Sequence, residues 1–271
     1  MQKSNTYFSI SYLSFLVSCF LFLGSDKLSA QDGTINTNTS VSSDITGKIM
    51  IVPFEPKLYL SEIDMKVNEQ TKWNFVQIRE NFRHQLDNQL KLKLQSTGTV
   101  LSFYTDSAKT WKDLMYTYKS TNLSSDLVDK PTDASAVNKK DSGIKNGEIH
   151  VEMSTDKKFM NTKITDKEVL NYLNSKYKSE YFIFVNELDI TSVPDSYDIS
   201  TDSYKREVGV HYSIIDKSGK TLNAGLLSTK FSSKENNPKK IVALCFAPIA
   251  ATISQKLSDI INPKPATTNK K

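Results

Sequence analysis

Glu187 and Asp189 are the two carboxylates whose spacing best suits acid–base chemistry. One residue separates them within an apolar segment, so a β-strand there would place both side chains on one face. Paired carboxyl groups can serve as general acid and general base, which would suit a hydrolase. The competing interpretation is a strand end that emerges into solvent. The sequence favours it, because no further catalytic motif accompanies the pair.

The three histidines and nine glycines give no sign of a metal or nucleotide site. His84, His150 and His211 do not form a His-x-x-x-His pair, so a zinc site would have to be assembled from distant segments. The glycines form neither a Gly-x-Gly-x-x-Gly turn nor a phosphate-binding loop. We therefore expect no bound metal ion or cofactor, and we assign no catalytic residue.

A polar segment holds Asp195, Asp198 and Asp202, with Tyr197 and Tyr204 beside them. The acidic spacing is not that of a calcium-binding loop. A solvated turn is the favoured interpretation, because Asp and Ser are common turn residues. The alternative is a rim that binds a sugar or a peptide.

Only two cysteines occur, Cys19 and Cys245. Cys19 lies in the predicted signal segment, so Cys245 has no partner for an internal disulfide. Cys245 is part of an apolar run, residues 242–246, and no histidine is near it in the sequence. We expect a buried structural thiol rather than a nucleophile.

Residues 1–30 have the order of a secretory signal: Lys3, an apolar stretch over 7–24, and small residues before Gln31. We expect cleavage before Gln31, so that the mature chain carries no membrane span. An uncleaved membrane anchor is one alternative. Lipidation is the other, because residues 16–19 resemble a lipobox that would make Cys19 the acylated first residue.

Composition predicts the organisation of the rest of the chain. Residues 31–47 contain almost no apolar residue, so they are expected to be a disordered leader. A single α/β domain should cover residues 48–261. A flexible polar insertion should interrupt it at about 121–147, and residues 262–271 should form a disordered tail.

Hydrophobic periodicity predicts the elements of the domain. The segments expected to be strands are 49–52, 100–104, 181–190, 208–214 and 222–231. The segments expected to be helices are 75–94, 108–119, 165–179 and 238–260. Thr165 and Glu168 have the spacing of a capping box, and Pro248 predicts a kink in the last helix.

The order of these elements predicts the fold class. Helices separate the first three strands, so these strands should be parallel. Short loops join the last three, so they should form an antiparallel meander. We expect an α/β fold with one mixed five-stranded sheet packed with helices. Residues 181–185 contain no polar residue, so this strand should be central and covered on both faces.

Charge and composition argue against a nucleic-acid partner. The chain has a net charge of +5 and is 38% hydrophobic, which is ordinary for a folded domain. Its adjacent basic residues occur as doublets, such as Lys139-Lys140 and Lys239-Lys240. Nucleic-acid binding usually requires a clustered basic stripe.

The segment Lys48–Phe54, an apolar strand that ends in Val-Pro-Phe, resembles the first strand of a family of envelope domains. The family includes the amino-terminal domain of the Tol-Pal propeller protein, the periplasmic part of the curli-secretion channel protein, and lipoprotein activators of penicillin-binding proteins. Residues 181–185, residues 210–219 and the segment from Thr221 onward resemble its later hairpin strands. The Leu-Ser-Ala-Gln junction is similar to those of exported Bacteroidetes proteins.

The resemblance implies a non-enzymatic protein that binds a protein partner in the cell envelope, because members of this family share no catalytic residues. Together with the signal, it predicts an exported protein that is periplasmic, outer-membrane-associated or secreted. The second hypothesis is a hydrolase-like enzyme with a site near Glu187 and Asp189. A pocket that holds both carboxylates would favour the enzyme, and a flat surface there would favour the binding protein.

Overall fold

The computed structural model describes residues 48–104, 107–127, 144–145, 148–149, 152–153 and 158–263. The predicted signal segment with Cys19, the predicted leader and His150 lie outside these residues. Most of the predicted insertion and residues 264–271 of the predicted tail also lie outside them.

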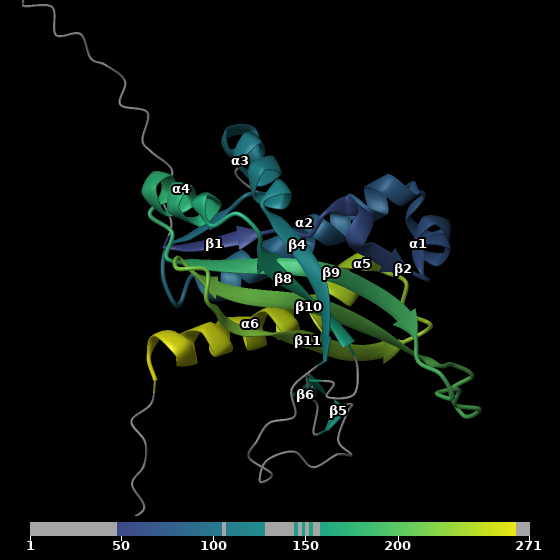
Figure 1. Ribbon diagram of the computed structural model, residues 1–271. Helices are drawn as coiled ribbons and strands as arrows, with labels where there is room; N and C mark the ends of the chain where they lie inside the picture. Colours follow the sequence, from purple (N-terminus) through teal and green to yellow (C-terminus); the bar gives the residue numbers. More distant parts are fainter. Residues whose placement is uncertain are drawn as a thin grey trace, which may run out of the picture. The chain divides into compact units, whose positions relative to one another are not determined.

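The main element of the fold is a seven-stranded mixed sheet (Figure 1). Its strands, in spatial order, are β3 (Val100–Ser102), β1 (Ile49–Val52), β9 (Tyr181–Ser192), β10 (Lys205–Asp216), β11 (Thr221–Ser232) and β7 (Glu152–Met153). The seventh strand, β2 (Tyr59–Ser61), pairs with β9 beyond the end of β1. β3, β1, β2 and β9 are parallel, and the pairs from β9 to β7 are antiparallel. The predicted α/β fold with a mixed sheet is therefore confirmed; β2 and β7 are additions to the five predicted strands.

Helices cover both faces of the sheet. The elements outside the strands are η1 (Pro56–Leu58), α1 (Asp64–Thr71), α2 (Phe75–Leu94), α3 (Ser107–Lys119), α4 (Glu168–Tyr177), α5 (Pro238–Ile241), the π-helical turn η2 (Val242–Phe246) and α6 (Ala247–Ile261). One core cluster joins α2, α5, η2 and α6 to one face. A second cluster joins α3 and α4 to the other face.

β9 is the central strand, and its side chains alternate between the two core clusters. Ile183 and Val185 pack in the cluster with α2 and α6. Phe182 and Phe184 pack in the cluster with α3 and α4. Both faces of the strand are therefore apolar and covered, as predicted from its lack of polar residues.

The helix starts follow local hydrogen-bonding chemistry. Asn74 and Gln77 form a capping box at α2, with both hydrogen bonds at 2.9 Å. The predicted capping box of Thr165 and Glu168 is wrong. The Thr165 N–H donates to the Ser120 carbonyl at 3.0 Å, which holds this residue at the end of the preceding strand. α4 therefore starts later, at Glu168, whose N–H donates to Asp166 Oδ1 at 3.0 Å.

Pro248 is accommodated by the π-helical turn η2 that precedes it. Pro248 has no N–H and lies in the first turn of α6, while Ala247 donates to the carbonyl of Val242, five residues back. A wider helical turn thus lies directly before the proline at which the sequence predicts a kink. Pro238–Ile261 is the one helical stretch of the described residues that is long and apolar enough to cross a membrane. Its Ile253 and Leu257 are buried in the core.

A second, two-stranded sheet lies over the main one. β4 (Thr121–Leu127) pairs antiparallel with β8 (Lys158–Ile164). This pair of strands, called the hairpin below, crosses β9, β10 and β11 (Figure 1). β5 (Ile144–Lys145) pairs with β6 (Glu148–Ile149). Residues 121–127 and 144–145 of the predicted flexible insertion at 121–147 thus form strands. β4 escaped prediction because it is polar and is held by hydrogen bonds rather than by apolar burial.

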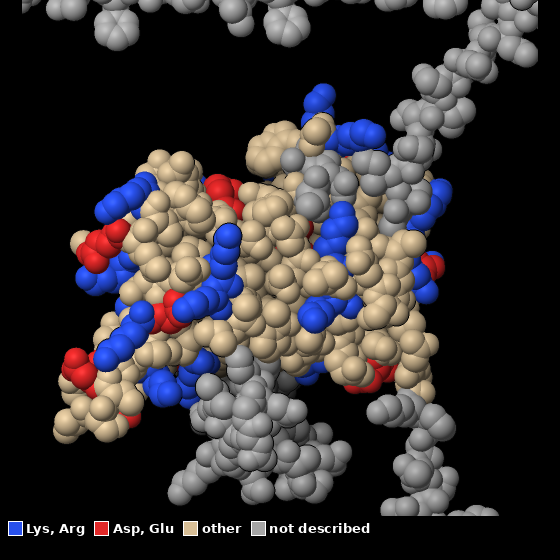
Figure 2. Space-filling view, turned by 180° about the vertical axis from the view of Figure 1, so that it is seen from behind, with Lys and Arg blue, Asp and Glu red and all other residues tan. Residues whose placement is uncertain are grey.

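Charged side chains are spread over the surface seen from behind. In Figure 2, Lys and Arg side chains are interspersed with Asp and Glu, and uncharged surface separates them. Lys91 and Lys93 end α2, and Lys239 and Lys240 lie in α5. In this view the basic residues do not join into a continuous stripe.

Candidate functional site

A β-bulge in β9 brings the candidate acidic residues together on one face of the sheet. Val185 pairs with Tyr212, and Glu187 pairs with His211, so Asn186 is an extra residue without a partner on β10. Two consecutive residues therefore share a face. As a result Asn186, Glu187 and Asp189 all project away from α2 and α6.

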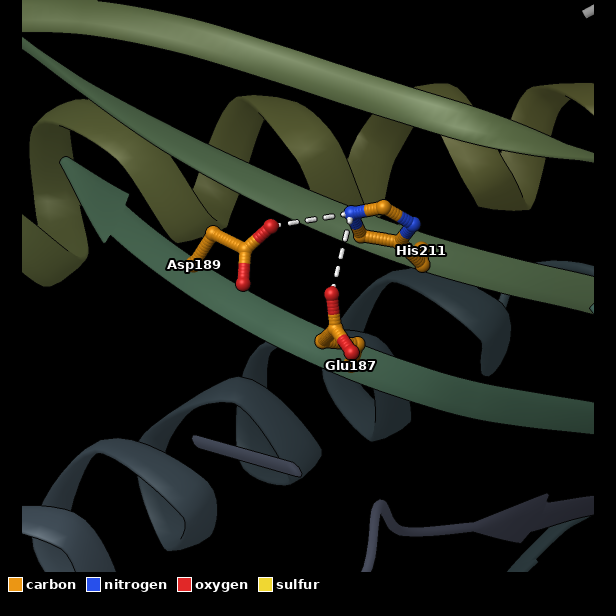
Figure 3. A group of neighbouring side chains, drawn as sticks. All are labelled: Glu187, Asp189 and His211. Carbon is orange, nitrogen blue, oxygen red and sulfur yellow. Dashed lines mark hydrogen bonds and ion pairs between the residues drawn. The ribbon is translucent and has the colours of Figure 1, made fainter. Parts of the chain in front are cut away.

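His211 lies between the two carboxylates (Figure 3). Its Nε2 is 3.0 Å from Asp189 Oδ2 and 3.7 Å from Glu187 Oε1. The side chains of His211, Glu187 and Asp189 are only 6%, 14% and 24% exposed. The predicted pair is therefore not a strand end that emerges into solvent. The sequence did not predict that His211 joins this pair, because the contact depends on the pairing of β9 with β10, which no local pattern indicates.

The backbone of β8 fixes the tautomer of His211. The Met160 N–H donates to Nδ1 at 2.9 Å, so Nδ1 must carry the lone pair. The proton of the neutral ring is then on Nε2, which donates to Asp189. Protonation of Nδ1 would break the hydrogen bond from Met160.

This tautomer does not fit a metal ligand. Glu187, Asp189 and His211 each offer a ligand atom within 4.8 Å of the others, which is a spacing that a metal ion could use. A histidine that binds a metal through Nε2 must have its lone pair there and its proton on Nδ1. The hydrogen bond from Met160 imposes the opposite arrangement.

Burial and the neighbouring Asp189 raise the pKa of Glu187, and His211 opposes this shift. Asp189 Oδ1 is buried and has no donor among the hydrogen bonds of the described residues. A protonated Glu187 would supply a donor to Asp189, and such a bond raises the pKa further. Burial and the adjacent carboxylate therefore favour the protonated form of Glu187 more than an exposed site would.

The same face of the sheet holds β8 through side chains. Asn186 Nδ2 donates to the Met160 carbonyl at 2.6 Å and to Ser213 Oγ at 2.8 Å. The Thr162 N–H donates to Ser213 Oγ at 3.1 Å, and Thr162 Oγ1 donates to Asn186 Oδ1 at 2.6 Å. His211, Ser213 and Asn186 thus occupy the edge of β8 that faces the sheet.

A cavity of about 350 Å³ lies beside this cluster, at the carboxyl end of β1. β1 pairs with β9 as far as Phe184, and β2 pairs with it from Leu188 onward. The cavity is lined by Val52, Pro53, Phe54, Glu55, Lys57, Leu58, Tyr118, Thr121, Asn122, Leu123, Met160, Thr162, Phe184, Val185 and Asn186. Glu187, Asp189 and His211 are not among them.

The position of the cavity follows from the topology. The connection from β1 to β3 contains α2, and the connection from β3 to β9 contains α3 and α4 on the opposite face. β1 and β9 therefore flank a topological switch point. Ligands of open α/β sheets bind at the carboxyl ends of such strands.

One wall of the cavity is fixed by buried polar groups. Tyr118 Oη donates to the Pro53 carbonyl at 2.5 Å and accepts from Arg83 Nη2 at 3.1 Å. Arg83 Nε also donates to the Phe54 carbonyl at 2.8 Å. Burial raises the pKa of Tyr118, so its hydroxyl stays protonated. The loop after β1 is therefore held in place without a ligand.

The acidic loop between β9 and β10 is a structured turn. Asp198 Oδ1 accepts from the Ser200 N–H and Oγ, and Tyr197 Oη donates to Asp202 Oδ1 at 2.6 Å. Asp195 and Asp202 adopt positive φ, as turn residues often do. Ile199 at the tip is 86% exposed. The carboxylates of Asp198 and Asp202 bond within the loop, which fits the predicted solvated turn.

The remaining candidates lie elsewhere. Cys245 is buried, which raises the pKa of its thiol to about 11, in agreement with the predicted structural role. His84 lies against Tyr104, with ring centroids 5.2 Å apart. Tyr204 lies beside Arg206, whose hydrogen bond lowers the pKa of the phenol.

The comparisons of this chain with protein families and with curated proteins return no match. No family model matches it, and no curated protein is similar to it in sequence. The resemblance of residues 48–54 and the later strands to envelope domains stays an expectation.

Proposed function

We propose that this chain is an exported protein of the cell envelope that binds another protein through its α/β domain and is not an enzyme. The signal-like residues 1–30 support export. The resemblance of residues 48–54 to envelope domains supports the partner class. The geometry around His211 supports binding rather than catalysis.

The observation that carries the proposal is the use of the polar cluster. His211, the imidazole beside Glu187 and Asp189 in Figure 3, accepts the Met160 N–H and donates to Asp189. A general base needs a free lone pair that faces a substrate. This lone pair instead holds β8, and neither carboxylate lines the 350 Å³ cavity.

A hydrolase-like enzyme is the second candidate, and the raised pKa of Glu187 favours it. General acids in hydrolases often have a raised pKa because they are buried beside a second carboxylate. Against this, the three side chains are largely covered, and the neighbouring cavity does not include them.

The experiment is cross-linking in intact cells followed by reconstitution. Cells that export a tagged full-length chain are treated with a short cross-linker, and the attached proteins are identified by mass spectrometry. The proposal requires that at least one envelope protein binds the purified mature chain directly, with saturable affinity. Glu187→Gln and Asp189→Asn should bind it like the parent.

Two results would contradict the proposed function. If no candidate reconstitutes binding, the proposed function is wrong. A hydrolytic activity that the parent shows and that Glu187→Gln and Asp189→Asn both lose would establish the second candidate in its place.

A further inference from the structure

The outer edge of β4 presents regularly spaced backbone hydrogen-bonding groups. In an antiparallel pair, two opposed residues either exchange backbone hydrogen bonds or both direct their N–H and C=O groups away from the partner strand. Met160 and Thr162 direct backbone groups to Asn186, His211 and Ser213, away from β4. The residues opposite them on β4 are Ser125 and Leu123, whose N–H and C=O groups therefore point to the outer edge.

One edge of the hairpin contacts the main sheet, and the other edge has no strand beside it among the described residues. The inner edge of β8 is occupied by the side chains of His211, Ser213 and Asn186. No described residue pairs with the outer edge of β4, and Ser125 is exposed. An open edge of this kind is a template for an added strand.

We propose that an extended segment of a partner protein adds to the outer edge of β4 as a third strand, with one apolar side chain in the 350 Å³ cavity. The inference rests on the proposed function and names its binding surface. Peptide recognition by strand addition takes affinity from backbone hydrogen bonds and specificity from pockets for alternate side chains.

The cavity lies where such a pocket is needed. Leu123 and Thr162 are opposite each other, and both line the cavity. Because side chains alternate along a strand, the residue of an added strand beside Leu123 would point to the same face. The walls there include Phe54, Leu58 and Phe184, which suit an aliphatic or aromatic side chain.

The probe is a phage-displayed library of seven-residue peptides, selected on the purified mature chain. Enriched peptides are synthesised and their affinities measured. Ser125→Pro removes an outward N–H without removing a bond to β8, and Ser125→Ala is the matched control that keeps it. We expect the peptides to bind Ser125→Pro at least tenfold more weakly and Ser125→Ala like the parent.

Hydrogen exchange of the parent protein tests the same edge without a variant. The Leu123 and Ser125 amides should exchange rapidly in the free protein and become protected when a peptide binds. Slow exchange in the free protein would mean that the chain itself covers this edge, which overturns the inference. Failure to enrich peptides, or equal binding to folded Ser125→Pro and Ser125→Ala, also overturns it.

The cross-linked envelope partner separates this inference from the proposed function. If a reconstituted partner binds Ser125→Pro as tightly as it binds the parent, a partner exists but does not use β4, and only the inference fails. If no partner reconstitutes while peptides protect the β4 amides, the edge binds extended segments but the proposed function fails.

Discussion

A single backbone N–H determines the proton position on His211. Met160 donates to Nδ1 across the interface between the hairpin and the sheet, and Nε2 is left to donate to Asp189. A residue that the sequence presents as isolated is thus one of three, with Asn186 and Ser213, whose side chains join the two sheets. We expect the hydrogen bond between Met160 and His211 to contribute measurably to the free energy of unfolding.

Replacing His211 with Phe should leave the partly buried Met160 N–H without an acceptor. The expected loss in the free energy of unfolding is about 1–3 kcal/mol, the range for an unsatisfied buried polar group. Urea unfolding measures it. The control is His84→Phe, because His84 contacts Tyr104 and not the hairpin, and its loss should be smaller. Equal losses would mean that the Met160 contact contributes nothing.

Glu187→Gln should raise the free energy of unfolding at neutral pH. The pKa of Glu187 is raised in the folded state above its ordinary value of 4.5, so the folded state holds this proton more tightly than the unfolded state does. That stabilisation is complete below pH 4.5 and is lost as the pH rises through the folded pKa. Glutamine cannot ionise, so it avoids this loss.

Urea unfolding across acidic to neutral pH measures the effect. The advantage of Glu187→Gln should shrink as the pH falls toward the ordinary pKa. Glu180→Gln is the control, because Glu180 is 41% exposed and bonded to surface lysines. An advantage that does not depend on pH would show that the pKa of Glu187 is not the cause.

Part of the cluster was readable from the sequence and part was not. Alternation placed Glu187 and Asp189 on one face, and the structure agrees. Their burial and their contact with His211 depend on the bulge at Asn186 and on strand pairing. Neither feature has a local sequence signal.

The elements differ in how strongly their sequences specify them. The five apolar segments predicted as strands all lie in the main sheet, because continuous or alternating apolar residues have few other ways to be buried. β4 and β8 lack such a pattern. Their positions depend on hydrogen bonds between β8 and the side chains of Asn186, His211 and Ser213, and these side chains are brought together only in the folded main sheet.

Phe184→Ala tests the central position of β9. Phe184 is 4% exposed and packs between the sheet and the α3–α4 layer, so its truncation should cost about 3–5 kcal/mol. Phe82→Ala, on the other side of the sheet, should be comparably damaging, because Phe82 is fully buried. Denaturant unfolding measures both changes.

Phe75→Ala is the matched control for these two variants. Phe75 is the first residue of α2 and is 59% exposed, so its truncation should change the free energy of unfolding by about 0.5 kcal/mol or less. If Phe184→Ala unfolds like Phe75→Ala, β9 is not covered on the α3–α4 face.

The whole molecule combines a predictable sheet with an added layer that could not be predicted. The order of helices and strands was sufficient to specify the mixed α/β fold, because parallel strands require crossover helices. The cavity at the switch point follows from that topology. Its outer wall does not, since it belongs to β4 and β8.

Export is a prediction at this scale. The mature protein should begin at Gln31 and be recovered in soluble form, because residues 28–30 have the small-residue pattern of a signal cleavage site. Mass spectrometry of the exported protein measures its amino terminus. An acylated Cys19 at the amino terminus would show instead that the chain is a lipoprotein.

Asn186 is the residue that β9 could lose without moving its other side chains to the opposite face of the sheet. Val185 and Leu188 are three positions apart, so strict alternation would place them on opposite faces. Because Asn186 is an extra residue between them, both lie in the core cluster with α2 and α6. Deleting Asn186 would restore that alternation and keep both halves of the strand facing α2 and α6. A deletion at Ile183 or Leu188 would instead turn part of the strand over. The shortened chain should keep its main sheet but lose the Asn186 contacts to Met160 and Thr162. Among the described residues, the hairpin would then keep its hydrogen bonds to His211 and Ser213 and the packing of Phe159 on Leu226.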